Sequence, residues 1–221
     1  MAKLSVIDLS GNTTGSIDLD DAVFGGEVRE HLLWEVVRSQ RAAKRRGTHK
    51  VKGRSEVNLT KDKYIKQKGS GGARHGSKRT NLYPKGGRVH GPVPHLYILH
   101  VNKKTMAGAL RSVLSLRAKA GDLLIVKEFN GEAPKTKLLA KGLEAIKAPR
   151  ALLVDSGENS WLRRTAANLA QSDFLDIRGL NVYDILRYPK LVIAEGVIRE
   201  LEARLLKTVP TRTAAAAGGA S

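Results

Sequence analysis

The sequence predicts an α/β fold in which a largely parallel sheet with helices on both faces is interrupted by a long basic loop. In the C-terminal half, short apolar runs alternate with helical patterns, and this order is typical of parallel sheets. Before that half lie about fifty residues that are rich in Gly, Lys and Arg and too poor in apolar side chains to fold around their own core. With 41% hydrophobic residues in 221, the rest of the chain can bury a core.

A helix is predicted on each side of the basic loop. The first starts near Glu27 and ends near Gly47, because one helical face carries Val28, Leu32, Leu33, Val36 and Val37. The second begins after Asn102, whose side chain can cap a helix, and stops at Gly121. Its apolar residues recur at helical spacing: Met106, Leu110, Val113 and Leu114.

The remaining elements alternate between strand and helix. Strands are predicted at residues 123–126, 151–154, near 174 and at 191–194. Helices are predicted at residues 134–147, 160–169 and 181–186, and a last helix runs through Val197, Leu201 and Leu205. We therefore divide the chain into a globular body at residues 1–43 and 101–207, a Gly-rich basic loop at 44–100 and a disordered tail at 208–221.

Charge indicates the leading class of partner. The chain has 39 Lys and Arg against 21 Asp and Glu, a formal net charge of +18, which favours a polyanion; acidic membrane surfaces are the alternative. The absence of Cys excludes disulfides, thiolate metal sites and Cys nucleophiles. Residues 1–8 lack the apolar stretch of a signal peptide, and no apolar run is long enough to span a bilayer, so we expect a soluble, cytoplasmic protein.

The excess positive charge is concentrated in the loop. Residues 41–90 hold 16 basic and 2 acidic residues, a net charge of +14, whereas residues 1–40 (3 against 7) carry −4 and residues 91–221 (20 against 12) carry +8. Tyr64, Tyr83 and several His and Gly are interspersed, which suits phosphate contacts, base stacking and close backbone approach to RNA. The loop is predicted to be disordered alone and ordered on a partner; a solvated linker is the alternative.

Two ligand sites that the loop suggests are rejected. A phosphate-binding loop is suggested by GGARHGSK at residues 71–78, but Ser77 precedes Lys78, and Arg74 stands where the dinucleotide-binding pattern needs its third Gly. Five of the six His lie from His49 to His100, yet neither Cys nor nearby carboxylates accompany them. We therefore predict no metal and no cofactor.

Catalysis is not predicted either. Asp155 follows the apolar run at residues 151–154, at the strand end where doubly wound enzymes keep functional groups, and this leaves an α/β enzyme as one alternative. We favour a turn residue within Asp155-Ser156-Gly157, because no Ser/His/Asp set or carboxylate pair stands out in the sequence.

Six groups of short motifs follow one another along the chain. They are Gly47-Thr48 with Lys52, Arg54, Glu56 and Val57; Gln67-Lys68-Gly69-Ser70-Gly71 with Ala73-Arg74 and Gly76-Ser77; Gly86-Gly87 with Gly91-Pro92 and Pro94; Val101-Asn102-Lys103-Lys104; Ala133-Pro134-Lys135-Thr136-Lys137; and Leu180-Asn181-Val182-Tyr183-Asp184. In these motifs the sequence resembles the bacterial form of ribosomal protein four of the large subunit. The resemblance covers nearly the whole chain apart from the tail.

This resemblance implies a non-enzymatic structural component of the large ribosomal subunit, located in the cytoplasm within the ribosome. It implies an α/β body on the solvent side and a loop threaded into ribosomal RNA, with no membrane and no small-molecule substrate as partner. Family members also act early in subunit assembly. The tip of the loop would reach the wall of the nascent-peptide exit tunnel close to ribosomal protein twenty-two, and it corresponds here to Gln67, Lys68, Gly69, Ser70 and Gly71.

The sequence departs from the family pattern at the tip. The pattern has Trp-Arg before Gln-Lys-Gly and Thr-Gly-Arg in place of the three residues that follow Lys68-Gly69. Here Ile65-Lys66 comes before the motif and Ser70-Gly71-Gly72 after it. An aromatic stack and two guanidinium contacts are therefore missing, and Lys does not replace the bidentate phosphate contact of Arg.

The candidate RNA-binding residues follow the loop from its base to its tip and back. At the base they are Lys44, Arg45, Arg46, Lys50, Lys52 and Arg54; near the tip they are Lys61, Lys63, Lys66, Lys68, Arg74, His75, Ser77, Lys78 and Arg79; on the return they are Lys85, Arg88, Lys103 and Lys104. Gly69, Gly71 and Gly72 would let the backbone pack against RNA. The alternative function is a free RNA-binding regulator, for example a translational repressor of its own message.

Overall fold

The computed structural model describes residues 2–131 and 133–207, and these form two units. The body comprises the residues up to Gln40 together with those from His100 onward, and the extended unit is Arg41–Leu99. The tail predicted at residues 208–221 lies outside the described residues.

The body is built on one sheet of six strands in the order β2-β1-β3-β6-β4-β5. Strands β1 and β2 form an antiparallel hairpin, and every other neighbouring pair is parallel. The predicted α/β fold with a largely parallel sheet is therefore confirmed. The strands are β1 Ala2–Ile7, β2 Thr13–Leu19, β3 Leu123–Val126, β4 Ala151–Asp155, β5 Asp173–Asp176 and β6 Lys190–Ala194.

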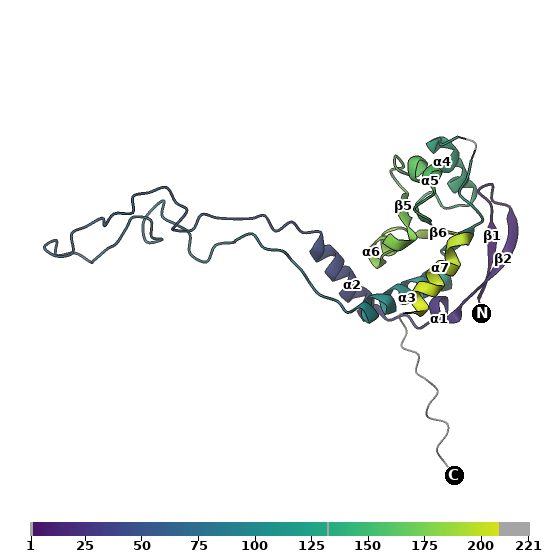
Figure 1. Ribbon diagram of the computed structural model, residues 1–221, viewed down its shortest axis with the longest axis horizontal. Coiled ribbons are helices and arrows are strands. Elements are labelled where there is room, and N and C mark those ends of the chain that lie inside the picture. Colours follow the sequence, from purple (N-terminus) through teal and green to yellow (C-terminus); the bar gives the residue numbers. More distant parts are fainter. Residues whose placement is uncertain (1, 132, 208–221) are drawn as a thin grey trace, which may run out of the picture. The chain divides into compact units, whose positions relative to one another are not determined.

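Seven α-helices and one 3-10 helix lie in the described part of the chain. They are α1 Asp21–Phe24, α2 Glu30–Ala43, α3 Lys103–Ala120, α4 Thr136–Ala145, α5 Ser160–Ala166, the 3-10 helix Ile177–Gly179, α6 Val182–Arg187 and α7 Glu195–Leu206. Right-handed crossovers place α4 and α5, which follow β3 and β4, on one face of the sheet, and α6, which leads back to β6, on the other. Figure 1 shows α4 and α5 on the opposite side of the sheet from α1, α3 and α7.

The N-terminal hairpin was not predicted. Strand β2 exposes its first four residues, Thr13 to Ser16, and buries only Ile17 and Leu19, so its alternation of apolar and polar residues is too short to indicate a strand. A register shift between Val6 and Ile7 adds a bulge to the pairing with β1. A polar edge strand of this kind gives little signal in a sequence.

The end of α2 and the cap of α3 differ from the predictions. Helix α2 ends at Ala43 and not near Gly47, because further helical turns would bring Arg45 beside Arg41. Asn102 has an extended backbone at the start of α3, as predicted, but its side chain makes no capping hydrogen bond. Gly121 ends α3 in the left-handed conformation, with φ 72°, as its position predicts.

The central strands carry the core. All five residues of β4 are buried, and in β6 Leu191, Val192 and Ile193 are each at most 1% exposed. Strands that are covered on both faces are apolar without alternation, which is why these runs were visible in the sequence. Each such side chain contributes about 1.5–3 kcal/mol on burial.

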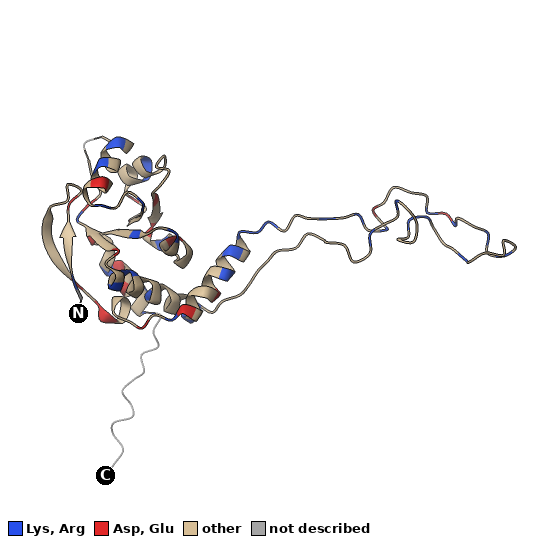
Figure 2. Ribbon diagram, turned by 180° about the vertical axis from the view of Figure 1, so that it is seen from behind, with Lys and Arg blue, Asp and Glu red and all other residues tan. Residues whose placement is uncertain are grey.

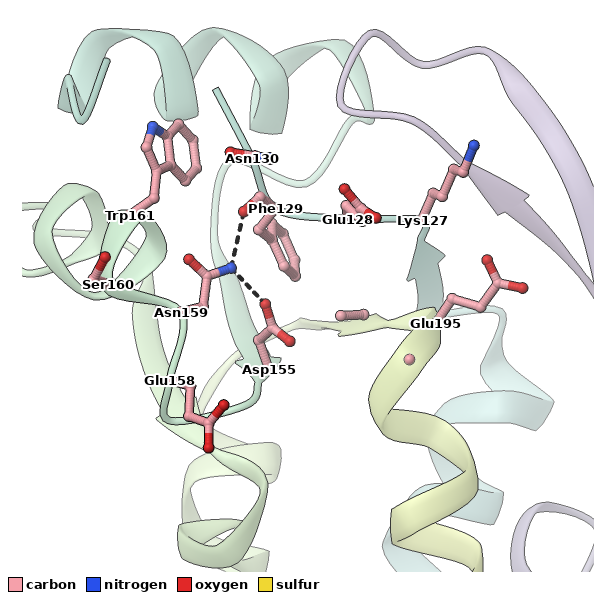
Figure 3. Close-up of a pocket in the computed structure, with 12 residues that line it drawn as sticks. Lys127, Glu128, Phe129, Asn130, Asp155, Glu158, Asn159, Ser160, Trp161 and Glu195 are labelled. Atoms are coloured by element: carbon pink, nitrogen blue, oxygen red, sulfur yellow. Dashed lines mark hydrogen bonds between the residues drawn. The ribbon is translucent and has the colours of Figure 1, made fainter. Parts of the chain in front are cut away.

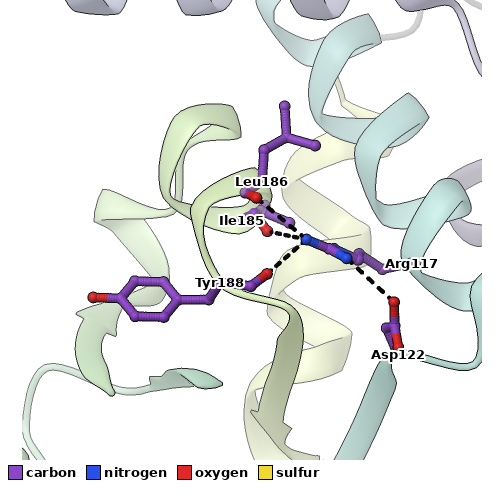
Figure 4. Close-up of polar contacts among 5 residues, drawn as sticks. All are labelled: Arg117, Asp122, Ile185, Leu186 and Tyr188. Atoms are coloured by element: carbon purple, nitrogen blue, oxygen red, sulfur yellow. Dashed lines mark hydrogen bonds and ion pairs between the residues drawn. The ribbon is translucent and has the colours of Figure 1, made fainter. Parts of the chain in front are cut away.

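A largely buried arginine joins α3 to the end of α6 (Figure 4). The Arg117 side chain is 13% exposed, and its Nη1 pairs with Asp122 Oδ2 at 3.2 Å. Its Nη2 donates to the carbonyl oxygens of Ile185 at 2.9 Å, Leu186 at 3.4 Å and Tyr188 at 2.6 Å. The last carbonyls of a helix have no partner within the helix, so Arg117 supplies a donor that α6 lacks.

Arg117→Met should destabilise the body, because it leaves these carbonyls and the Asp122 carboxylate without their donor. We expect the free energy of unfolding to fall by about 2–3 kcal/mol, measured by urea denaturation of the full-length protein. The matched control is Arg29→Met, since Arg29 is exposed and its pairing with Glu27 at 3.7 Å lies in water; a change within about 0.5 kcal/mol is expected there. Equal effects of the two changes would contradict the structural role of Arg117.

Candidate nucleic-acid interface

The extended unit doubles back on itself with almost no core. Within Arg41–Leu99, all of which the structure describes, Gly87 is the one buried residue. Apart from the end of α2, regular pairing is limited to an isolated bridge between Lys63 and Ser77. Two branches run side by side (Figure 1) and are joined by backbone hydrogen bonds from His95 N to Gly47 O at 3.2 Å, Val51 N to Pro92 O at 3.2 Å and Arg88 N to Lys52 O at 3.0 Å.

Lys and Arg follow one another along this unit, with few acidic residues between them (Figure 2). Most of the predicted RNA-binding residues are exposed. These are Lys44, Arg45, Arg46, Lys50, Lys52, Arg54, Lys61, Lys63, Lys66, Lys68, Arg74, Lys85, Arg88, Lys103 and Lys104. The other four, His75, Ser77, Lys78 and Arg79, are half-buried, so the protein itself uses part of their surface.

Ring stacking orders the base of the unit. The Arg45 guanidinium lies 3.6 Å from the centroid of the Tyr97 ring, and the ring of His95 lies 4.4 Å from Tyr97. The His49 ring completes the group, 5.7 Å from His95. A stacked guanidinium keeps its in-plane N–H donors free to bind a phosphate bidentately, so Tyr97 orients Arg45 without consuming it.

A short turn holds one of the predicted cations in an ion pair. Glu56 Oε1 accepts from Lys50 Nζ at 2.6 Å, and its Oε2 accepts from Gly53 N at 3.1 Å. The Lys50 ammonium, followed by the Gly53 N–H, lowers the pKa of the Glu56 carboxyl. Lys50 therefore brings less net charge to a phosphate than its neighbours do.

Three predicted contacts near the far end bind the chain's own backbone and rings. Ser77 Oγ donates to Thr60 O at 2.7 Å, and Arg79 Nε donates to Leu59 O. Lys78 Nζ lies 4.0 Å from the centroid of the Tyr64 ring. These side chains join segments that lie 14 to 20 residues apart, a separation that local sequence patterns do not report.

Beside them lies a small aromatic group. Tyr83 contacts Tyr64 and His75 edge to face, with ring centroids 5.7 and 5.5 Å apart. The Tyr83 hydroxyl is buried and has no partner among the described residues. These ring contacts stabilise this end of the unit, where no apolar side chain is buried.

The predicted tip has one side-chain contact to the preceding branch and two glycines with left-handed backbone. Lys63 Nζ donates to Gln67 Oε1, which links the tip to the branch before it. Gly69 and Gly71 adopt φ values of 87° and 65°, which few other residues tolerate. Lys68 before them and Ser70 between them are exposed.

Lys103 and Lys104 belong to the body, where they occupy the first turn of α3. Cations at a helix N-terminus oppose the helix dipole, so their position is unfavourable for the helix itself. A phosphate at this end would remove the conflict, and their exposure leaves them available for one.

The alternative enzymatic site is a hollow of 760 Å³ at the carboxyl ends of β3, β4 and β6. Asn159 Nδ2 donates there to Phe129 O at 2.9 Å and to Asp155 Oδ2 at 2.7 Å (Figure 3). Asp155 Oδ1 accepts from Ser156 N at 2.7 Å. Both carboxylate oxygens thus shape the turn, and among the described residues that line the hollow none is a His that could act as a base for Ser160.

Two other classes of site are absent from the part of the chain that the structure describes. No helix in residues 2–131 or 133–207 combines the length and the apolar character needed to cross a lipid bilayer. Within those ranges, no three His, Asp or Glu side chains gather where they could hold a metal ion.

Comparison with known proteins identifies the family. A model of the ribosomal protein L4/L1 family matches residues 17–204. The chain belongs to this family. Since these proteins are structural components of the ribosome, the predictions of a ribosomal, non-enzymatic protein located in the cytoplasm within the ribosome are confirmed.

Relatives match over almost their entire length. A protein of Anaeromyxobacter dehalogenans (strain 2CP-C) is 50% identical over 205 residues, which is 93% of this chain and 100% of the relative. Proteins of Rhodopseudomonas palustris (strain BisB5) and Methylocella silvestris are each 42% identical over 203 residues, 91% of this chain and 98% of each relative. All three are named large ribosomal subunit protein uL4.

Some residues that support the interface without being charged were not predicted from the sequence. Tyr97, which stacks on Arg45, lies in the run His95-Leu96-Tyr97, and an aromatic residue two positions after a His was the available signal. The backbone carbonyls of Leu59 and Thr60, which hold Arg79 and Ser77, carry no signal in the sequence.

The pKa of Glu56 can be measured by NMR titration of its side-chain carboxyl carbon in the isolated protein, because the contacts that close this turn lie within seven residues and need no partner. We expect a midpoint below the value of about 4.3 for an unperturbed glutamate, so that the carboxylate stays charged to lower pH. Lys50→Met should raise the midpoint, because it removes the largest cause of the shift. Lys52→Met, whose charge is a smaller cause, is the control; equal shifts for the two variants would contradict the proposed contact.

Asp155→Ala should affect stability and nothing else. We expect the free energy of unfolding to fall by about 1–3 kcal/mol, because the amide groups of Ser156 and Asn159 lose an acceptor. Growth of a strain carrying this as its single copy, and RNA binding by the purified protein, should match the wild type. Glu158→Ala, which removes an exposed acid from the same hollow, is the control; loss of a measurable turnover on changing Asp155 would instead indicate an enzyme.

Proposed function

We propose that this protein is built into the large ribosomal subunit and that its extended unit, Arg41–Leu99, binds ribosomal RNA. One observation carries the proposal: residues 41–90 hold 16 basic residues against 2 acidic ones, in a unit with a single buried residue. The large-subunit assignment is supported by the name of the relatives, large ribosomal subunit protein uL4.

A unit without a core needs stabilisation from outside the chain. Fixing the backbone costs about 1–2 kcal/mol per residue, and hydrophobic burial cannot offset this where a single Gly is buried. Contacts between cations and phosphates release counterions from RNA and are favourable at physiological salt. RNA thus takes the place of the missing core.

A glycine near the tip supports a close approach of RNA. Gly72 and Gly76 have negative φ, and a Cβ added to either would meet no atom within 4 Å. By contrast, a Cβ at Gly87 would overlap the backbone of Arg54, so the protein itself requires that glycine. Because nothing in the chain requires glycine at residue 76, we assign its lack of a side chain to the surface of the partner, whereas at residue 72 the family pattern has an arginine.

The finer assignments rest on the family motifs. We propose that residues 67–71 reach the wall of the nascent-peptide exit tunnel close to ribosomal protein twenty-two, and that the protein acts early in subunit assembly. The match of Gln67-Lys68-Gly69 to the family pattern, together with family membership, supports this placement. Ile65 and Gly72 are the departures that would alter contacts at the tunnel wall.

Sedimentation separates an integral component from a free RNA-binding regulator, and a charge variant tests the interface. The tagged protein should stay with large subunits after a high-salt wash.

In filter binding of the purified protein to a complete large-subunit RNA transcript, Lys44→Ala/Arg45→Ala/Arg46→Ala should make the slope of log affinity against log salt less steep by about 2–3, at roughly 0.7–0.9 for each lost phosphate contact.

The control removes three exposed charges from the body: Lys3→Ala/Arg29→Ala/Lys141→Ala. This variant should leave the slope nearly unchanged. Release of the protein from subunits at high salt, or equal slopes for the two triple variants, would contradict the proposal.

A further inference from the structure

One face of α2 carries an exposed aromatic ring and two exposed cations. Trp34, Arg38 and Arg41 stand at positions i, i+4 and i+7, so they share a face, whereas Leu33 and Val36 are buried in the body. The Trp34 side chain is 64% exposed. The Arg38 guanidinium lies 5.2 Å from the centroid of the indole ring.

This arrangement is costly for a helix that only needs to cover a sheet. An exposed indole leaves a large apolar area in water, and a polar residue at this position would avoid that. The face also becomes more basic along the helix, from Glu30 in the first turn to Arg41 in the last. A flat ring with one guanidinium group over it and a second cation on the same helix face is a combination with which proteins bind bases and phosphates of RNA.

We infer that this face of α2, formed by Trp34, Arg38 and Arg41, is a further RNA-binding surface, on which Trp34 stacks against an unpaired base while the two arginines contact neighbouring phosphates. The inference rests on the proposed function of the extended unit. Two observations favour RNA over a protein partner: the two cations match phosphates in charge, and α2 leads directly into Lys44, Arg45 and Arg46, which the proposed function assigns to RNA.

The two tryptophans of the chain allow a direct test. Trp161 is half-buried in the body and donates its Nε1–H to Ala133 O at 2.9 Å. Because the chain has two tryptophans, the variant Trp161→Phe keeps Trp34 as its sole indole. On titration with the complete large-subunit RNA transcript, we expect the emission of Trp34 to change and its quenching by acrylamide to fall severalfold. Unchanged emission and quenching while filter binding shows a saturated complex would overturn the inference.

Substitutions separate stacking from charge. Trp34→Ala should weaken binding about tenfold with no change in the salt slope, because stacking on a base involves no counterion, and Trp34→Phe should restore most of the affinity. Arg38→Ala should make the slope less steep by about 0.7–0.9. Arg29→Ala, which removes an exposed cation from outside α2, should change neither quantity, and equal melting temperatures show that each variant is folded.

Each failure has a different meaning. If the wild-type protein does not bind the transcript, the proposed function fails. If it binds and the α2 variants bind equally well with the same slope, only the surface on α2 is overturned. Protection of Trp34 by added ribosomal proteins, but not by RNA, would also overturn it and would indicate a protein interface.

Discussion

The shortage of apolar side chains in the middle of the chain constrains the rest of the molecule. The body is stabilised by its own contacts: β4 and β6 are buried on both faces, and Arg117 supplies the donors that α6 lacks. The extended unit has no such solution, because it buries one glycine. The positive charge concentrated at residues 41–90 is opposite in sign to that of RNA phosphates, and this is why we propose that RNA stabilises the shape of the unit.

Within the extended unit, cations have two kinds of role. Some are exposed and oriented, as Arg45 is by the ring of Tyr97. Others are used inside the unit: Arg79 binds the carbonyl of Leu59, and Lys78 lies over Tyr64. Under the proposed function, the number of Lys and Arg is therefore larger than the number of phosphate contacts, and the internal contacts set the spacing of the exposed cations.

Much of the fold could be predicted from the sequence, and the exceptions have physical causes. The run Leu123 to Val126 is strongly apolar, and the strand found there has the predicted bounds. The hairpin of β1 and β2 could not be predicted, because its edge strand is mostly polar. The residues of the predicted site could be chosen from the sequence only by their type and charge. Whether a chosen side chain is exposed, as Lys61 is, or binds the chain itself, as Ser77 binds Thr60 O, depends on contacts between positions far apart in the sequence.

The two edges of the sheet have a consequence for the protein before it is assembled with any partner. Strand β2 is bulged against β1 and contains Gly15 and Asp18, and the opposite edge, β5, is four residues long with an aspartate at each end. Short, bulged or charged edge strands resist pairing with the edge of another molecule. Newly made copies can thus accumulate side by side without joining their sheets into aggregates.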